Sequence, residues 1–336
     1  MVFALILASI ALLGSCSNRK QSAQTIRVGY FPNITHGQAL IGLSRGDFGA
    51  SLGPAVTIDA KAFNAGPSVI EALFAGQIDL SYIGPNPAIN GYVKSKGAAL
   101  RVIAGAESGG ASLVVRRDSG ISTPAELAGK TIATPQLGNT QDVALRGYLK
   151  SIGLLPRENG GNVIVQPMEN PTILDAFRQN RIDGAWVPEP WASRLEVEGN
   201  GLLLIDERTL WQDGRFTTAL IIVSKKFLDE HRDTVKAWLR AHVKITQWEL
   251  ENPEEAIRLA NAEIKRLTGK ELQNEILMRA WPRMEPTFDP LIPTLQKSAD
   301  SAFTAGFLKE NPDLSGIADL SLLNEILAES GLPEIR

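Results

Sequence analysis

The chain has 336 residues, of which 44% are hydrophobic and 21% charged, and a formal net charge of −3. This composition is typical of a globular protein of about two domains with enough apolar side chains for a core. The slightly acidic balance argues against a nucleic-acid partner. The single cysteine excludes a disulfide within the chain and any metal site built on thiolates.

An apolar run at residues 2–13 is too short to span a membrane. It leads into Leu13-Gly14-Ser15-Cys16, which resembles a bacterial lipobox. The resemblance implies lipidation of Cys16, with residues 1–25 as lipoprotein signal peptide and tether. It also implies a location on the periplasmic or cell-surface side of a bacterial membrane. No Lys or Arg precedes the run, unlike in most signal peptides, so an unprocessed apolar N-terminus remains an alternative.

Residues 26–45 predict a strand, a short loop and the start of a helix. The apolar run 26–31 is typical of a buried parallel strand. Pro32 ends it, because proline cannot continue the ladder of hydrogen bonds. Thr35 is an expected helix N-cap, followed by apolar residues at helical spacing. In a parallel α/β sheet such a loop lies at the carboxyl edge, where ligands bind.

The chain repeats this construction with an offset of 104 positions. Residues 66–84 match residues 170–188, and identical pairs include Pro67/Pro171 and Asp79/Asp183. The same offset places residues 26–35 on residues 130–139. A repeat this long predicts two similar α/β lobes, each with a central mixed, mostly parallel sheet, and not a solenoid. The alternative is that both segments merely share the same order of helix, loop and strand.

The expected elements divide the chain between these lobes. Strands are predicted at 55–63, 78–83 and 101–106, and a polar joint at 107–111 then leads into the second lobe. A strand at 219–223 returns to the first lobe, and the chain from residue 225 onward is mostly helical. We therefore expect lobe 1 at residues 26–107 plus 215–336, and lobe 2 at residues 108–214.

The loops that follow the expected strands contain no Lys or Arg. They carry hydroxyls, amides and glycines, and several adjoin helix N-termini, which bear about half a positive charge and unpaired N–H groups. This pattern predicts a neutral site for a small anion, although helix capping alone would explain some of these residues. We find no dinucleotide, hydrolase or metalloprotease motif, so no catalytic residue, cofactor or metal is expected.

Three elements carry a family resemblance: residues 28–36 (VGYFPNITH), Ala65-Gly66-Pro67 with its following Gly76-Gln77-Ile78-Asp79 turn, and Trp186 followed by residues 188–191 (PEPW). Over residues 26–223 the chain resembles the solute-binding proteins of ABC importers for nitrate, taurine and aliphatic sulfonates. The resemblance implies a type II periplasmic-binding fold with a cleft that closes on the solute, a monomer, and permease and ATPase subunits as partners. It implies these ligand-binding residues: Asn33, Thr35, His36, Gly66, Ser68, Asn86, Ser108, Asn139, Thr140 and Trp186.

Two points stay open at this stage. Glu189 and Glu107 border the expected cleft and would receive the amine of a zwitterion such as taurine, or they face solvent. A similar fold occurs in the thiamine-pyrimidine synthases, whose chemistry requires a cysteine-rich iron motif and a reactive lysine. The lone Cys16 and the lysine-free loops disfavour that enzyme, but binding of a pyrimidine precursor without chemistry remains an alternative.

Overall fold

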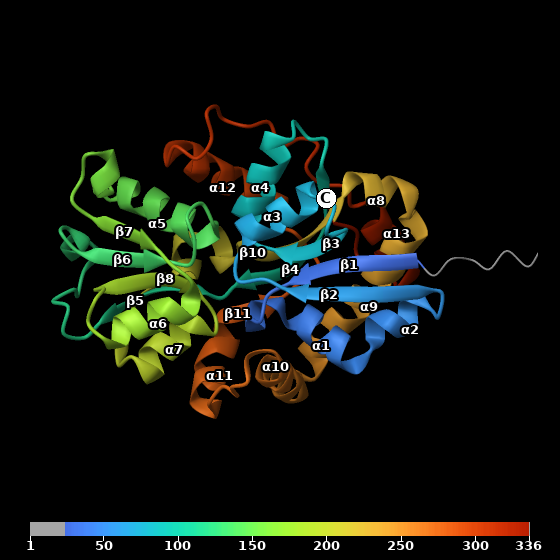
Figure 1. Ribbon diagram of the computed structural model, residues 1–336, viewed down its shortest axis with the longest axis horizontal. Coiled ribbons are helices and arrows are strands. Elements are labelled where there is room, and N and C mark those ends of the chain that lie inside the picture. The colour runs from blue at the N-terminus through green and yellow to red at the C-terminus, as the bar shows by residue number, and fades with distance from the viewer. Residues whose placement is uncertain (1–23, 336) are drawn as a thin grey trace, which may run out of the picture.

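Two β-sheets form the centres of two α/β lobes that lie side by side (Figure 1). The computed structural model describes residues 24–335, so the expected lipobox at Cys16 lies outside the described residues. The strands of lobe 1 are ordered β11-β4-β10-β3-β1-β2 and those of lobe 2 β7-β6-β8-β5-β9. The two-lobe α/β fold expected from the sequence is confirmed.

The sheets are mixed. Parallel pairs join β1 to β2 and β3, and β6 to β7 and β8, whereas every pair that includes β4, β5, β9, β10 or β11 is antiparallel. In lobe 1 the strands are β1 (Gln24–Tyr30), β2 (Val56–Ala62), β3 (Leu80–Ile83), β4 (Leu100–Gly109), β10 (Thr217–Ser224) and β11 (Met284–Pro286). In lobe 2 they are β5 (Ala111–Arg116), β6 (Thr131–Thr134), β7 (Ile164–Pro167), β8 (Gly184–Pro188) and β9 (Gly201–Asp206).

Helices surround both sheets (Figure 1). Before the chain enters lobe 2 it forms α1 (Gly37–Arg45), α2 (Asp47–Leu52), α3 (Gly66–Phe74) and α4 (Pro85–Lys94). Lobe 2 contains α5 (Thr140–Ser151), α6 (Asn170–Arg178) and α7 (Trp191–Glu198). The C-terminal region forms α8 (Lys225–Glu230), α9 (Arg232–Glu251), α10 (Pro253–Thr268), α11 (Asn274–Ala280), α12 (Ile292–Thr304) and α13 (Ser321–Glu329). No helix within residues 24–335 is both long enough and apolar enough to cross a membrane.

Central strands are buried on both faces, as their sequences predict. All four residues of β3 are buried, and β10 is buried from Thr217 to Val223. Alternate residues of β10 enter two different cores, with Ile221 packing on the α1 and α9 side and Ile222 on the α4 and α12 side. Continuous apolar runs, and not alternating ones, are expected of strands sandwiched between helix layers.

The internal repeat has a structural counterpart. Helices α3 and α6 begin 104 positions apart. The two matching aspartates also make equivalent hydrogen bonds, to residues that are themselves 104 positions apart. Asp79 Oδ2 accepts from the N–H of Arg27 at 2.9 Å, and Asp183 Oδ2 accepts from the N–H of Thr131 at 2.8 Å. Each carboxylate therefore fastens the turn before β3 or β8 to the strand beside it.

The crossing between the lobes differs from the expected polar joint at residues 107–111. Strand β4 continues to Gly109 and β5 begins at Ala111, so one residue separates them. Gly109 and Gly110 have φ angles of 77° and 72°, which favour glycine. The joint is therefore a strand with two left-handed glycines, because pairing with β10 and β11 extends β4 past the apolar run.

The C-terminal helices contact both lobes. Helix α12 packs on α4 of lobe 1 and on α5 of lobe 2, and α11 packs on α7. The exact boundaries expected for the two lobes stay a prediction. Among the described residues, the chain passes from the sheet of lobe 1 to that of lobe 2 near Gly110 and returns before Thr217.

Candidate ligand-binding site

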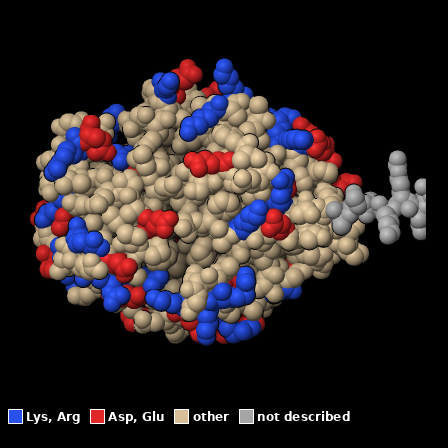
Figure 2. Space-filling view, in the orientation of Figure 1, with Lys and Arg blue, Asp and Glu red and all other residues tan. Residues whose placement is uncertain are grey.

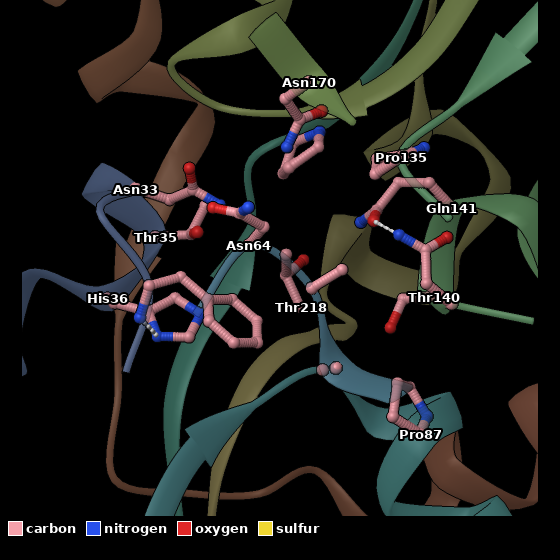
Figure 3. A pocket seen from close by; sticks show the side chains of 16 residues that line it. Asn33, Thr35, His36, Asn64, Pro87, Pro135, Thr140, Gln141, Asn170 and Thr218 are labelled. Atoms are coloured by element: carbon pink, nitrogen blue, oxygen red, sulfur yellow. Dashed lines mark hydrogen bonds between the residues drawn. The ribbon is translucent and has the colours of Figure 1, made fainter. Parts of the chain in front are cut away.

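A small cavity lies between the lobes at the carboxyl ends of β1, β3, β6 and β8. Its volume is about 30 Å³. In Figure 3, Asn33, Thr35 and His36 lie on one side of the opening, Thr140 and Gln141 on the other, and Thr218 between them. The cavity, called the inner cavity below, is lined by Phe31, Asn33, Thr35, His36, Asn64, Ala65, Gly66, Gly84, Pro87, Pro135, Asn139, Thr140, Gln141, Asn170, Pro188 and Thr218.

The inner cavity follows the internal repeat. Five pairs of lining residues stand 104 positions apart, one member from each lobe. These pairs are Phe31/Pro135, Thr35/Asn139, His36/Thr140, Gly66/Asn170 and Gly84/Pro188. The two lobes therefore present equivalent loops to the same small space, as expected where similar α/β units meet at their carboxyl edges.

Four helices begin at the wall of the inner cavity, namely α3, α4, α5 and α6. Side-chain caps are absent at the described N-termini of α3, α4 and α6, and prolines occupy their first turns. The first N–H groups of a helix have no partner inside it, and they carry part of the positive end of the helix dipole. These starts supply electropositive backbone donors without any charged side chain.

Helix α5 is the exception, because the loop before it is fixed by side chains. Asn139 Oδ1 accepts from the N–H of Asp142 at 2.9 Å, which is the N-cap geometry. The carboxylate of Asp142 accepts from the hydroxyl of Thr134 at 2.9 Å and from the N–H of Gly138 at 2.8 Å. This network holds Thr140, the first residue of α5, at the wall.

Two fully buried side-chain atoms of the lining have no hydrogen-bond partner among the described residues. They are Oγ1 of Thr140 and Oδ1 of Asn170, and both are buried. A buried polar atom left unpaired costs about 1–3 kcal/mol. Both atoms belong to the first residue of a helix in lobe 2, so they mark this wall as built for a polar ligand.

His36 contributes a neutral imidazole. Burial lowers the pKa of His36 to about 3, so the ring is uncharged at neutral pH. Its Nδ1 accepts from the N–H of Phe31 at 3.3 Å. The ring proton is therefore on Nε2, which makes this atom a hydrogen-bond donor.

With His36 neutral, none of the sixteen lining residues carries a formal charge. The wall instead offers hydroxyls, amides, one imidazole N–H and helix starts. Such a wall suits a small oxyanion held by many neutral donors, since helix N-termini bind anions without a formal cation. A carboxylate that could receive a ligand amine does not occur among these lining residues.

Six of the residues singled out from sequence meet at the inner cavity: Asn33, Thr35, His36, Gly66, Asn139 and Thr140. Sequence reasoning did not name Asn64, Gln141, Asn170 or Thr218 as site residues. Asn170 had a signal, because it stands 104 positions after Gly66. No sequence pattern indicated Thr218, because it lies on strand β10, which returns to lobe 1 and has no counterpart in the internal repeat.

Ser68, Asn86 and Ser108 do not line the inner cavity, and their role as ligand-binding residues stays a prediction. Ser68 faces a neighbouring hollow beside Leu137. Asn86 lies in the first turn of α4, and its amide donates to the carbonyl of Ser298 at 3.0 Å. The hydroxyl of Ser108 accepts from the N–H of Phe216 at 3.3 Å. Ser68 and Ser108 therefore line other hollows between the lobes, whereas Asn86 packs against α12.

Trp186 and Glu189 also lie outside the inner cavity. Trp186 is fully buried in the core of lobe 2, and its Nε1 donates to Glu207 Oε2 at 2.7 Å. Glu189 is fully buried and accepts from Arg283 and from the Ser193 hydroxyl, each at 3.0 Å. Glu189 therefore neither lines the inner cavity nor faces solvent, and its carboxylate already has a cation. Its contact with a ligand amine stays a prediction. Glu107 is likewise buried away from the cavity, and neither carboxylate oxygen is assigned a hydrogen-bond partner within residues 24–335.

Trp191, and not Trp186, lies between the lobes. Its Nε1 donates to Oδ1 of Asn33 at 2.9 Å, which links α7 of lobe 2 to the loop after β1. Asn64 and Glu169 form a second link, at 3.1 Å between Nδ2 and Oε1. Both links lie beside the inner cavity and hold the lobes together around it.

Comparison with family models adds the decisive observation, because residues 19–264 match the model described as the NMT1-like family. The chain belongs to the NMT1-like family. One curated relative is the taurine-binding periplasmic protein of Escherichia coli (strain K12), 29% identical over 59% of this chain and 59% of its own length. Another is a putative aliphatic sulfonates-binding protein of Bacillus subtilis (strain 168), 24% identical over 96% of this chain and 94% of its own length.

Solved structures share the fold of this NMT1-like chain. The alkanesulfonate-binding protein SsuA from Xanthomonas axonopodis pv. citri, bound to MOPS, has a TM-score of 0.72 at 21% identity and covers 85% of this chain and 95% of its own. The periplasmic nitrate-binding protein NrtA from Synechocystis PCC 6803 has a TM-score of 0.75 at 16% identity, covering 93% of this chain and 92% of its own. At these identities the likeness shows the fold alone.

Proposed function

We propose that this chain is the solute-binding component of an ABC importer and that it captures a small anion, with a sulfonate preferred over nitrate. The observation that carries the proposal is the uncharged inner cavity with four helix starts and the unpaired Thr140 hydroxyl at its wall. A sulfonate keeps its charge at every physiological pH and offers three oxygens to neutral donors. Hydrogen bonds to a charged acceptor are roughly twice as strong as neutral ones.

The named relatives support the same assignment, since they are described as taurine- and sulfonate-binding proteins. Taurine itself is less favoured as the solute, because no carboxylate lines the inner cavity to receive its ammonium group. A site without a formal cation also suits a carrier that must release its cargo to a permease. We further propose that Cys16 is lipidated and tethers the protein to the membrane beside that permease.

Isothermal titration calorimetry of the purified chain tests the solute class. The panel contains ethanesulfonate, taurine, nitrate and a free pyrimidine. We expect ethanesulfonate to bind more tightly than taurine and nitrate, with an affinity that does not change between pH 6 and pH 8 because His36 stays neutral. Binding of the pyrimidine alone, without any of the anions, would contradict the proposal.

A further inference from the structure

A buried ion pair lies directly behind the start of helix α5. The carboxylate of Asp142 accepts from Nε of Arg146 at 3.1 Å, and both side chains are buried. Asp142 follows Asn139, Thr140 and Gln141, which line the inner cavity, but neither member of the pair lines it. The carboxylate therefore lies within one helical turn of a wall that has no formal charge of its own.

Three donors converge on this carboxylate, and two of them belong to the loop before α5. Oδ1 accepts from the hydroxyl of Thr134, whereas Oδ2 accepts from the N–H of Gly138 and from Arg146. Gly138 has a φ angle of 73°, which favours glycine. The position of the carboxylate therefore sets the path by which the chain reaches Thr140 at the wall of the inner cavity.

Arg146 is held from two further sides. Its Nη1 donates to Oε1 of Glu158, whose side chain is half exposed. The ring centroid of Phe307 lies 5.5 Å from its guanidinium carbon. Phe307 follows α12, a helix of the C-terminal region that packs on α5. The guanidinium is thus shielded from water, and a charge in such surroundings acts more strongly than one at the surface.

The internal repeat shows that the fold does not require this ion pair. The offset of 104 positions matches Asp142 to Gln38 and Arg146 to Gly42, both in α1. Gln38 is fully buried, and its amide donates to the carbonyl of Ala106 at 2.7 Å. Lobe 1 therefore builds the equivalent helix start with a neutral amide and no cation. The charged pair is a feature of lobe 2 alone.

A carboxylate at this place opposes the capture of an anion. An acidic side chain in the first turn interacts with the positive end of the helix dipole, which a bound anion also needs, and like charges repel strongly inside a protein. Figure 2 shows basic and acidic side chains interspersed over the visible face. That face therefore adds little field of one sign, and buried charges close to the inner cavity dominate the potential that a solute meets there.

We propose that Arg146 is a positioning residue for the captured anion, which acts by cancelling the charge of Asp142. This inference rests on the proposed function and deepens it. Asp142 shapes the loop before α5 through its hydrogen bonds, and Arg146 allows it to do so without repelling the solute. The arginine thus supports anion binding although it does not line the inner cavity.

Three variants separate this electrostatic role from a purely structural one. Asp142→Asn keeps the hydrogen bonds, because its amide oxygen accepts from Gly138 and Arg146 while its NH₂ group donates to the hydroxyl of Thr134. It removes one negative charge, whereas Arg146→Met removes one positive charge. The double variant restores the balance. Lys150→Met is the control, since Lys150 is exposed on the same helix.

The probe is ethanesulfonate, titrated by calorimetry at low ionic strength. We expect Asp142→Asn to raise its affinity about tenfold and Arg146→Met to lower it about tenfold, the size expected of one unit charge about 10 Å away inside a protein. The double variant should bind like the parent chain. Lys150→Met should change the affinity less than about twofold, because exposed charges are screened. Circular dichroism and thermal melting establish that each variant folds like the parent chain.

The signs of these changes decide the outcome. Weaker binding in Asp142→Asn, Arg146→Met and the double variant alike would show a structural role only, and it would overturn the inference while leaving the proposed function intact. Should Arg146→Met not fold, Asp142→Asn decides alone: stronger binding supports the inference, and unchanged or weaker binding overturns it. Absence of ethanesulfonate binding by the parent chain would overturn the proposed function and this inference together.

Discussion

Arg283 Nη1 lies 3.0 Å from Oε1 of Glu189 and 2.6 Å from Oε2 of Glu196, and all three side chains are buried or nearly so. The arginine follows α11 in the C-terminal region, and both glutamates belong to lobe 2. The N–H of Gly110 donates to the carbonyl of Arg283 at 2.8 Å, which places this ion cluster at the crossing between the lobes. The cluster therefore fastens the C-terminal region to lobe 2 beside the hinge.

Replacement of this arginine should be costly. Arg283→Met removes the cation from two buried carboxylates, and breaking a buried ion pair on one side costs about 3–5 kcal/mol. Urea denaturation should show that loss in the free energy of unfolding. Arg258→Met is the matched control, because Arg258 is 64% exposed and pairs with the exposed Glu255. Its loss should cost at most about 1 kcal/mol, and equal costs for both variants would contradict this account.

The repeat explains why much of the fold could be predicted from the sequence. The offset of 104 positions reflects real equivalence, since Asp79 and Asp183 make the same hydrogen bonds to residues that are also 104 apart. Helix α5 begins at Thr140, directly after residues 130–139, which the offset matches to the strand and loop of residues 26–35. Local signals succeed here because strand, loop and helix start are neighbours in the chain.

Contacts between distant segments could not be predicted in the same way. Glu189 is satisfied by Arg283, 94 positions later, and nothing near Glu189 in the sequence indicates a partner. Trp186 and Trp191 both follow the pattern of the resemblance, but the alternation of β8 turns Trp186 into the core. Only Trp191, past the end of the strand, reaches the other lobe. The orientation of a side chain on a short strand thus decides which of the two tryptophans lies between the lobes.

Truncation of the Thr140 hydroxyl should weaken anion binding. Its Oγ1 lines the inner cavity and has no protein partner among the described residues. Thr140→Val should lower the affinity for ethanesulfonate by about 10- to 100-fold, which corresponds to about 1–3 kcal/mol. Thr140→Ser should retain most of the affinity. Thr172→Val, at an exposed position of α6, is the control, and unchanged binding by Thr140→Val would refute anion capture at this helix start.

Stability should depend on pH through Glu249. This side chain is buried and has no hydrogen-bond partner in the part of the chain that the structure describes, and burial raises its pKa to about 8 from an ordinary value of 4.5. Between these values the folded chain holds a proton that the unfolded chain releases. The stabilisation is therefore complete below about pH 4.5 and is lost as pH rises to about 8, with a slope of about 1.4 kcal/mol per pH unit.

Other buried acids, such as Glu107 and Glu207, also have pKa values raised by burial and would contribute to the same pH dependence. Comparing variants separates the contribution of Glu249 from theirs. Glu249→Gln should flatten the decline in the free energy of unfolding between pH 5 and pH 8. Glu251→Gln, exposed on the same helix, should keep it. Parallel curves for Glu249→Gln and the parent chain would show that Glu249 does not titrate in this range.

Membrane attachment through Cys16 is testable in a host that processes lipoproteins. The full chain should fractionate with membranes, because two acyl chains anchor a protein stably where one does not. Cys16→Ser should appear in the soluble fraction. Mass spectrometry of the membrane form should place the lipid on Cys16, and equal fractionation of both proteins would remove the anchor from the proposal.

Trp191 should report the closing of the cleft. The hydrogen bond from its Nε1 to Asn33 joins the two lobes, so the indole leaves this environment when the lobes separate. Gly109 and Gly110, both with left-handed φ angles, lie at the crossing where a hinge can absorb the change. Ethanesulfonate should alter the tryptophan emission of the parent chain by favouring the closed state.

Trp191→Phe should remove most of that signal, and it should weaken ethanesulfonate binding by about 0.5–1.5 kcal/mol, because one neutral hydrogen bond of the closed state is lost. Trp248→Phe is the control, since Trp248 packs against Arg45 of α1 and does not line the inner cavity. Small-angle scattering of both variants, with and without saturating ethanesulfonate, measures closure independently of fluorescence. A full emission change in Trp191→Phe, together with a scattering profile that ligand does not alter, would show that the lobes do not close through this contact.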